Sequence, residues 1–486
     1  MNPYIFPIKK PALFPVWLSQ YAIAVYFLAL AVVSFMYSEY GLPWYYVLSG
    51  AIAVLTVFLY SKTLLDATSL RRMRKERSFE KRIFIIAMAF RVTTMFILYA
   101  IFQQNFNDAF GIESGDAMFY EEQATEYAEA LRNGNFGDVW KVTADKIDIS
   151  DLGYATYMGL IYWLTGNSII VVRLLKCLFS AMTAVLIYRL AKRNFGEETG
   201  RLAAILIALW PNFWYYCAVH LKETEMVFLS VLFVEQADQM LKSRQFTAWK
   251  IIPILLVAAA LFTVRTPLGL VALLALAFSV VMSSSKVVSW GKRIIIGILA
   301  LLLIGVVAGN RIQEQTRGLV EKVQSGQQRD NMEWRATRDN GNAFAKYAGK
   351  SVFAPLIFTI PFPTLANIED QDVQQLLNGG NFVKNIISAF TILAMVMLLI
   401  TRKWREHLLP LSFMLGYLVV LTVIAFAQSE RFHQPAMPFE FMFAAYGLSI
   451  AVTKKKYKRW FTYWCALMFI ACIAWNWFKL AGRGMA

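Results

Sequence analysis

The sequence predicts an all-α polytopic membrane protein, and its composition, its hydropathy and the length of its apolar segments are the three observations behind that prediction. Of 486 residues, 58% are hydrophobic and 16% are charged, whereas an ordinary soluble domain has about 25% charged residues. Mean hydropathy is +0.48. Apolar segments of roughly 17 to 25 residues, long enough to cross a bilayer as helices, recur along most of the chain and predict about 13 transmembrane helices.

The first apolar segment runs from about Pro11 to Tyr37 and is expected to remain in the protein as a helix. It is longer than the apolar core of a signal peptide, which has about 7 to 15 residues, and no convincing cleavage site follows it. The predicted spans lie near residues 12–37, 43–66, 83–103, 168–191, 200–219, 224–241, 251–266, 268–285, 293–309, 380–401, 406–427, 435–452 and 459–479.

The net charge of +16 is concentrated in short loops between these spans, and its placement indicates membrane orientation and not a nucleic-acid partner. Loops rich in Lys and Arg tend to stay in the cytoplasm. This orientation places the two long polar segments of the chain on the outer side. The basic stretches are residues 9–10, 71–82, 189–201, 242–250, 286–293, 402–405 and 454–459.

The chain divides into five parts on this topology. Residues 1–104 and 380–486 are N-terminal and C-terminal transmembrane helices, and residues 168–309 are a transmembrane core. Residues 105–167 form a first external loop with interfacial helices. Residues 310–379 form a second external loop, which could be a lid or a plain connection. We expect the function to reside on the outer side, where both loops lie.

The first external loop contains two predicted helices. In EEQATEYAEALRNG the apolar residues recur on one side at helical spacing, and the helix is expected to end at Gly134. Such an amphipathic helix lies along a membrane surface. The next apolar piece, GYATYMGLIYWLTG (153–166), is too short to cross the bilayer and predicts a second interfacial or re-entrant helix. The residues expected on the solvated face of the first helix are Glu121, Glu122, Glu126 and Glu129.

Two stretches of the chain carry a resemblance to a known group of enzymes. GYATYMGLIYWLTGNSIIVVRLLKCLFSAMTAVLIYRLAKRNFGEETGRLAAILIALWPNFWYY (153–216) resembles the core of the polyprenyl-phosphate-sugar-dependent membrane glycosyltransferases, the GT-C superfamily that includes aminoarabinose transferases and protein O-mannosyltransferases. SERFHQPAMPFEF (429–441) is similar to the Arg-containing, Pro-rich end of a late helix in these enzymes. One departure is Ala155, where many members have Pro; Tyr154 beside it is a supporting candidate for the site.

The resemblance implies that an Asp in the first external loop, followed a few residues later by Tyr, is the catalytic base. GDAMFY supplies Asp116 and Tyr120. The residue type suits the chemistry, because an inverting transfer from a lipid-phosphate sugar needs a carboxylate that takes the proton of the acceptor hydroxyl. Asp116 could also cap a helix that begins at Ala117. Asp108 is the reserve candidate, although an ordinary loop role fits it better.

The transfer also needs cations on the leaving phosphate, and AVHLKETEM (218–226) places ionisable residues at an outer helix boundary. Lys222 can bind phosphate as a point charge, or it can pair with Glu223 or Glu225 at the interface. His220 and Glu223 are supporting candidates in the same stretch.

Arg431 is the leading candidate for holding the donor phosphate, because a planar guanidinium can hold two phosphate oxygens at once and its outer loop is short. His433 beside it could donate to the same oxygens or could be a local structural donor. Arg265, in FTVRTPLG at an outer helix turn, is a further candidate.

No metal-binding motif, cofactor or disulfide framework is predicted. The four cysteines, Cys177, Cys217, Cys465 and Cys472, lie in apolar runs without the spacing of metal ligands. Glu223 with Asp116 could hold a divalent cation, but a count of carboxylates is weak support for a metal.

The sequence thus predicts an inverting glycosyltransferase with Asp116 as general base, which moves a sugar from a polyprenyl-phosphate donor to a lipid, glycan or protein hydroxyl. The expected place is the outer (periplasmic) face of a bacterial-type cytoplasmic membrane. Two alternatives stay open: an O-antigen ligase or polymerase-like enzyme, and a lipid or solute transporter. Transporters favour repeated halves with broken helices at the midplane, whereas the ionisable residues here gather around one acidic loop.

Overall fold

The computed structural model describes residues 13–67, 76–135, 149–243, 247–282, 356–423, 429–453 and 455–483. Within these ranges every regular element is a helix, and the one β-type contact is an isolated bridge between Gly41 and Ala366. The predicted all-α class is therefore confirmed. The predicted span near 293–309 and most of the second external loop lie outside the described residues.

Several of the described helices have the length and composition needed to cross a membrane. Six spans in this part of the chain are long and apolar enough to cross a bilayer, one of them formed by two α-helices and the π-helical turn between them, and three shorter apolar helices accompany them. The protein is thus a multi-pass membrane protein, while the count of 13 spans stays a prediction. The six are Val16–Met36, Trp44–Ala67, Ser78–Phe106, Ile169–Phe195, Asn378–Ile400 and Lys456–Ala481.

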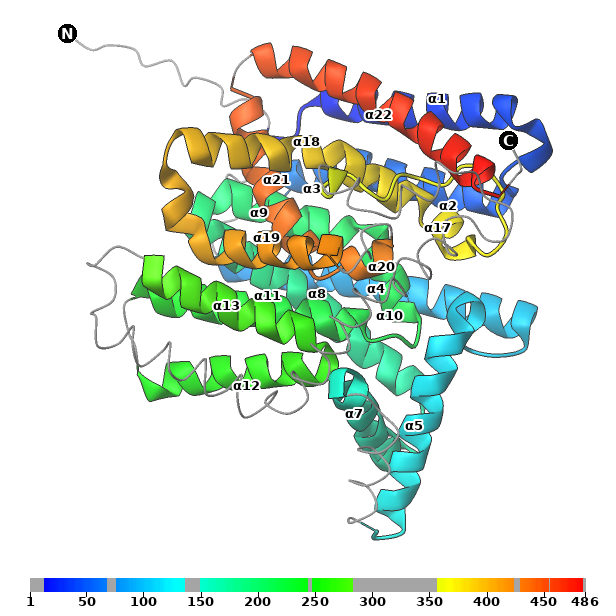
Figure 1. Ribbon diagram of the computed structural model, residues 1–486, viewed down its shortest axis with the longest axis vertical. Helices are drawn as coiled ribbons and strands as arrows, with labels where there is room; N and C mark the ends of the chain where they lie inside the picture. The colour runs from blue at the N-terminus through cyan, green and yellow to red at the C-terminus, as the bar shows by residue number, and fades with distance from the viewer. Residues whose placement is uncertain are drawn as a thin grey trace.

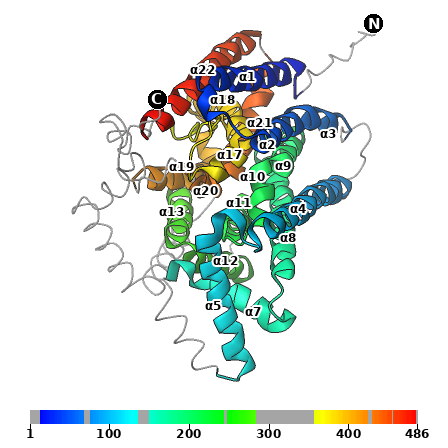
Figure 2. The same ribbon diagram turned by 90° about the vertical axis from the view of Figure 1, so that its right-hand side faces the viewer.

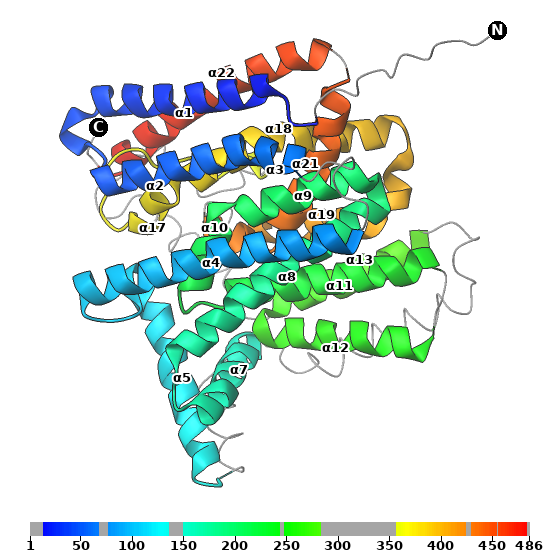
Figure 3. The ribbon, with the colours of Figure 1, turned by 180° about the vertical axis from the view of Figure 1, so that it is seen from behind.

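The N-terminal helices pack on the outside of the bundle. They are α1 (Val16–Met36), α2 (Trp44–Leu55), α3 (Ser61–Ala67) and α4 (Glu76–Phe106), and a π-helical turn joins α2 to α3. Seen from behind, α4 runs beside α8 (Ile169–Phe195), with which it packs (Figure 3).

The centre of the bundle is formed by α9 (Glu197–Leu209), which follows α8 after Gly196. All residues of α9 from Thr199 to Leu209 are buried, and the one charged residue among them, Arg201, pairs with Glu197. Gly196 has φ +93°, a left-handed value that lets the chain reverse between the two helices. Extended Trp210 then separates α9 from α10 (Pro211–Ala218), where the proline occupies the first turn.

The remaining described helices complete the bundle around this centre. Figure 1 shows α1 and α22 along one side of the bundle and α12 and α13 along the opposite side. The helices are α11 (Glu223–Ser243), α12 (Ala248–Val264), α13 (Thr266–Met282), α17 (Asp372–Leu376), α18 (Asn378–Ile400), α19 (Leu408–Val423), α20 (Glu430–His433), α21 (Met437–Ala451) and α22 (Lys455–Ala481). Short 3-10 turns lie at Ser38–Tyr40, Gly111–Glu113 and Lys403–His407.

Two helices of the first external loop, α5 (Ser114–Arg132) and α7 (Ile149–Thr165), project together from the bundle, and we call them the protruding helix pair (Figure 2). Tyr120 and Ala124 of α5 pack with Met158 and Tyr162 of α7 in one apolar cluster. A Cβ on Gly159 would lie 2.6 Å from the Tyr127 ring, so this glycine permits the close approach.

The end of α5 lies where the sequence predicts it. Gly134 has φ +72°, and the amide of Asn135 donates to the carbonyl oxygen of Ala130 at 3.0 Å, which is the Schellman pattern. The start differs from the prediction, because the helix begins at Ser114 and not at Ala117. Asp116 consequently lies inside the first turn, where a negative charge favours the helix dipole.

Candidate active site

The structure brings together several of the predicted site residues from segments far apart in the sequence. Asp116 comes from α5, Glu223 from the start of α11 and Arg431 from α20. Arg431 Nη1 lies 2.5 Å from Asp116 Oδ2, and Arg431 Nε donates to Glu223 Oε1. One guanidinium therefore joins two carboxylates from two other helices.

The two carboxylates that contact Arg431 differ in their exposure to solvent. The side chain of Glu223 is 2% exposed and that of Asp116 is 60% exposed, while the arginine side chain itself is 14% exposed. Arg431 is therefore held from the interior by Glu223 and reaches the surface at Asp116.

A second ion pair lies next to the first and includes a residue that sequence reasoning missed. Lys222 Nζ donates to Asp151 in α7, and also to the carbonyl oxygen of Ser150 at 3.0 Å. Tyr120 donates its hydroxyl to the same Asp151 carboxylate at 2.8 Å. Asp151 lies two residues before the GYATY stretch, and its position beside that stretch is the only signal in the sequence that could have pointed to it.

The two ion pairs are close enough to influence the pKa values of Lys222 and Tyr120. Burial lowers the pKa of Lys222, Asp151 opposes that shift, and the nearby positive charge of Arg265 adds to it. Burial raises the pKa of the Tyr120 hydroxyl, and the charges of Asp151 and Glu223 raise it further. Tyr120 is therefore a neutral hydrogen-bond donor at neutral pH.

Arg265 lies beside this group at the break between α12 and α13. It has an extended backbone, with φ −160° and ψ 99°. Its amide donates a hydrogen bond to the carbonyl oxygen of Leu261 in the last turn of α12. Its guanidinium carbon is 4.9 Å from the centre of the Phe432 ring, next to Arg431 in α20. Three cationic side chains that the sequence predicts to bind the donor phosphate therefore lie close together. They are Arg431, Lys222 and Arg265.

His433 has a different environment. Its Nδ1 lies 2.8 Å from Nζ of Lys384 in α18, and Lys384 also donates to the carbonyl oxygen of Ile360 at 2.6 Å. Both side chains are buried within the bundle. This geometry agrees with the local structural role that the sequence left open for His433, and Lys384 is a buried cation that the sequence analysis did not single out.

His220 connects the loop before α11 to the protruding helix pair. Its Nε2 lies 3.1 Å from Glu121 Oε2, and Tyr162 donates its hydroxyl to the same carboxylate. Burial lowers the pKa of His220 to about 4 against the opposing effect of Glu121, so the ring is neutral at neutral pH. Glu121 is thus part of an internal contact and does not lie on a solvated face as expected.

Two further candidates have structural partners. Asp108 Oδ1 accepts from the amides of Phe110 at 2.7 Å and Gly111 at 2.9 Å, which is the ordinary loop role. Tyr154 is fully buried, with its hydroxyl 3.5 Å from Nζ of Lys176. Nζ of Lys176 also lies 3.1 Å from a carboxylate oxygen of Glu225. Glu225 is therefore the ion-pair partner of a buried lysine.

The described residues contain no group of three or more His, Cys, Asp or Glu side chains arranged to hold a metal ion. Asp116 and Glu223, the two carboxylates considered for a divalent cation, contact the same guanidinium. In this arrangement Arg431 provides the positive charge between them.

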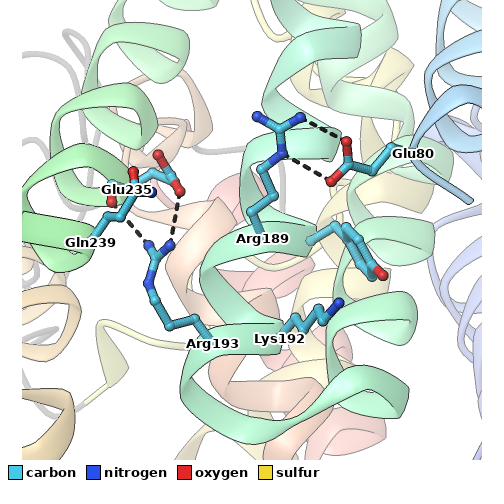
Figure 4. Close-up of a pocket in the computed structure, with 7 residues that line it drawn as sticks. Glu80, Arg189, Lys192, Arg193, Glu235 and Gln239 are labelled. Carbon is cyan, nitrogen blue, oxygen red and sulfur yellow. Dashed lines mark hydrogen bonds and ion pairs between the residues drawn. The ribbon is translucent and has the colours of Figure 1, made fainter. Parts of the chain in front are cut away.

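A pocket of about 550 Å³ lies toward the other end of α8 (Figure 4). Arg189 pairs there with Glu80 of α4, and Arg193 pairs with Glu235 of α11. The helix rises by about 20 Å between Lys176 and Arg189. The pocket is therefore separate from the group around Asp116, and its charged side chains join α8 to the helices on both sides.

Comparison with known proteins relates the middle of the chain to a protein family. Residues 153–309 match the family described as dolichyl-phosphate-mannose-protein mannosyltransferase. The match includes Lys222, Glu223 and Arg265, whereas Asp116 and Arg431 lie outside it. No curated protein matches the chain.

The family match confirms the predicted resemblance to the GT-C glycosyltransferases. Together with the apolar helices that can span a bilayer, it supports a multi-pass membrane glycosyltransferase of the GT-C kind.

Proposed function

We propose that the protein is an inverting glycosyltransferase that moves a sugar from a polyprenyl-phosphate donor to a hydroxyl acceptor at the outer face of a cytoplasmic membrane. The observation that supports this best is the contact of Arg431 with both Asp116 and Glu223, beside the ion pair of Lys222 with Asp151. A carboxylate and several cations at one site are what such a transfer requires.

In the proposed reaction Asp116 accepts the proton of the acceptor hydroxyl. The acceptor oxygen attacks the anomeric carbon from the face opposite the phosphate, and the bond from that carbon to the phosphate oxygen breaks. The lipid phosphate leaves with the bonding electrons and one more negative charge. Arg431, Lys222 and Arg265 stabilise this charge, since charge-assisted hydrogen bonds to phosphate are the strong ones.

The remaining residues of the group orient these cations. Glu223 holds Arg431 from the buried side, and Asp151 with Tyr120 holds Lys222. A divalent cation held by Asp116 and Glu223 is a separate expectation, and a loss of turnover in a chelator that divalent ions reverse would support it.

The proposal is tested by incubating the purified, detergent-solubilised protein with a panel of polyprenyl-phosphate sugars and candidate acceptors, and by identifying the products with mass spectrometry. A sugar transferred with inverted anomeric configuration and without an ion gradient is the expected result. No transfer with any donor, together with uptake of solute by reconstituted vesicles, would favour a transporter.

The assignment of the base has its own test. Asp116→Asn cannot accept a proton at neutral pH, so turnover should fall by about 10²- to 10⁴-fold. Glu129→Gln is the matched control, because Glu129 is an exposed carboxylate on the same helix, and it should keep most activity. Near wild-type turnover of Asp116→Asn would remove Asp116 from the reaction.

A further inference from the structure

The two carboxylates that contact Arg431 differ in burial. This difference affects when Asp116 can act as a general base. Glu223 is buried in the first turn of α11, while Asp116 is more than half exposed on α5. Removing the partner of a buried charge is strongly unfavourable. An exposed ion pair, in contrast, changes an equilibrium by only about one- to fivefold. The contact to Asp116 is therefore the one that a competing anion can replace.

We infer that the donor phosphate displaces Asp116 from Arg431, so that the base becomes available only after the donor has bound. This inference rests on the proposed function, because it takes the donor to be a lipid phosphate and Asp116 to be the base. Arg431 then has two roles in sequence. It first holds the carboxylate of Asp116, and it then holds the phosphate.

The ion pair with Arg431 restrains the carboxylate of Asp116. Its Oδ2 accepts a hydrogen bond from Arg431 Nη1, at 2.5 Å, and this contact occupies one oxygen of the carboxylate. A general base must present an oxygen to the acceptor hydroxyl at hydrogen-bond distance. When the phosphate takes Nη1, Asp116 is free to turn toward the acceptor.

Glu223 keeps the guanidinium in place during this exchange. It contacts Nε, on a different edge from the Nη1 atom that contacts Asp116. The phosphate can therefore replace one carboxylate while the other still orients Arg431. The expected consequence is a compulsory order, in which the donor binds before the acceptor.

Carboxyl footprinting tests the release directly and needs no acceptor. A water-soluble carbodiimide couples glycine ethyl ester to accessible carboxylates, and peptide mass spectrometry measures the extent at each residue. A polyprenyl monophosphate should raise labelling of Asp116 by about two- to fivefold. The polyprenol of equal length should not, and labelling of Glu129 should stay constant in both cases.

A variant supplies the second arm of the experiment. Arg431→Gln combined with Glu223→Gln removes both charges of this ion pair together, so that Glu223 is not left as a buried charge without Arg431. In this variant Asp116 should be labelled strongly from the start and should not respond to the polyprenyl monophosphate.

Native mass spectrometry of the same samples reports whether the polyprenyl monophosphate binds. Binding to the wild type without increased labelling of Asp116 overturns the inferred release and leaves the proposed phosphate site intact. Absence of binding overturns both the release and the proposed donor.

Discussion

Arg431 joins three parts of the protein through a single side chain. The short helix α20 carries it, α11 supplies Glu223, and α5 supplies Asp116. These residues are separated by long stretches of sequence, so their arrangement depends on the packing of the whole bundle. A change at Arg431 should therefore affect both ligand binding and the carboxylates that it holds.

Arg431→Lys should weaken binding of the polyprenyl-phosphate donor by about tenfold, because an ammonium cannot hold two oxygens in the fixed geometry of a guanidinium. The charge beside buried Glu223 is kept, so folding should be preserved. Binding can be measured by native mass spectrometry. Arg405→Lys, at an exposed position on the 3-10 turn after α18, is the matched control and should bind like the wild type. Equal affinity in the two variants would move the phosphate toward Lys222 and Arg265.

His220 should make the protein sensitive to mild acid. Its pKa is lowered to about 4 in the folded protein, whereas an unfolded histidine titrates near 6.5. As the pH falls below 6.5 the unfolded chain takes up the proton first, so stability is lost progressively down to pH 4. The loss should reach on the order of 3 kcal/mol at the acid end.

The acid sensitivity can be measured as the melting temperature in detergent between pH 7 and 4.5. The wild type should lose stability more steeply than His220→Gln, whose amide can still donate to Glu121. Parallel curves for the two proteins would show that His220 is not responsible.

At the scale of helices, ion pairs connect the C-terminal end of α8 to α4 and α11. Arg193 contacts Glu235 at 3.0 Å and Asp238 at 2.7 Å, and both carboxylates lie on α11 and are nearly buried. Arg189 pairs with Glu80 on α4, but its side chain is 50% exposed. Arg189 thus contacts the Glu80 carboxylate from an exposed position, whereas Arg193 contacts two nearly buried carboxylates.

Arg193→Ala should lower the free energy of unfolding by about 1 to 3 kcal/mol, because it leaves Glu235 without this partner in a nearly buried position. Arg189→Ala is a control on the same helix and should change it by no more than about 1 kcal/mol. Melting temperatures of the purified variants would compare them. A larger loss for Arg189→Ala would contradict the ranking by burial.

The elements that the sequence predicts well are those set by local rules. The apolar length of α1 and α4, and the end of α5 at Gly134, follow from residues close together in the chain. The contacts of the candidate site are different. Asp151 with Lys222, Glu121 with His220 and Lys384 with His433 form only when distant segments pack together. Residue type favours Arg431 and the family resemblance points to Asp116, but neither can show that the two residues contact each other.

For the whole molecule, the charge distribution predicts that the protruding helix pair lies outside the cell and the 3-10 turn at Lys403–His407 lies inside. In a background without Cys177, Cys217, Cys465 and Cys472, Glu129→Cys should react with an impermeant thiol reagent on intact cells. Lys403→Cys should react only after permeabilisation. Both positions are exposed, so reactivity reports the side of the membrane. The reverse result would invert the orientation.

The protruding helix pair carries exposed large apolar side chains, and two of them follow the candidate base Asp116 closely in α5. Met118 and Phe119 on α5 are 53% and 40% exposed, and Leu164 on α7 is 72% exposed. An amphipathic helix with exposed apolar side chains settles about 5 to 10 Å into the boundary between headgroups and acyl chains. We therefore expect the reaction to take place at a fixed depth, level with the phosphates of the surrounding lipids. A lipid-anchored donor would then reach the site by diffusing within two dimensions, and its own anchor would already hold its phosphate at the height of Arg431.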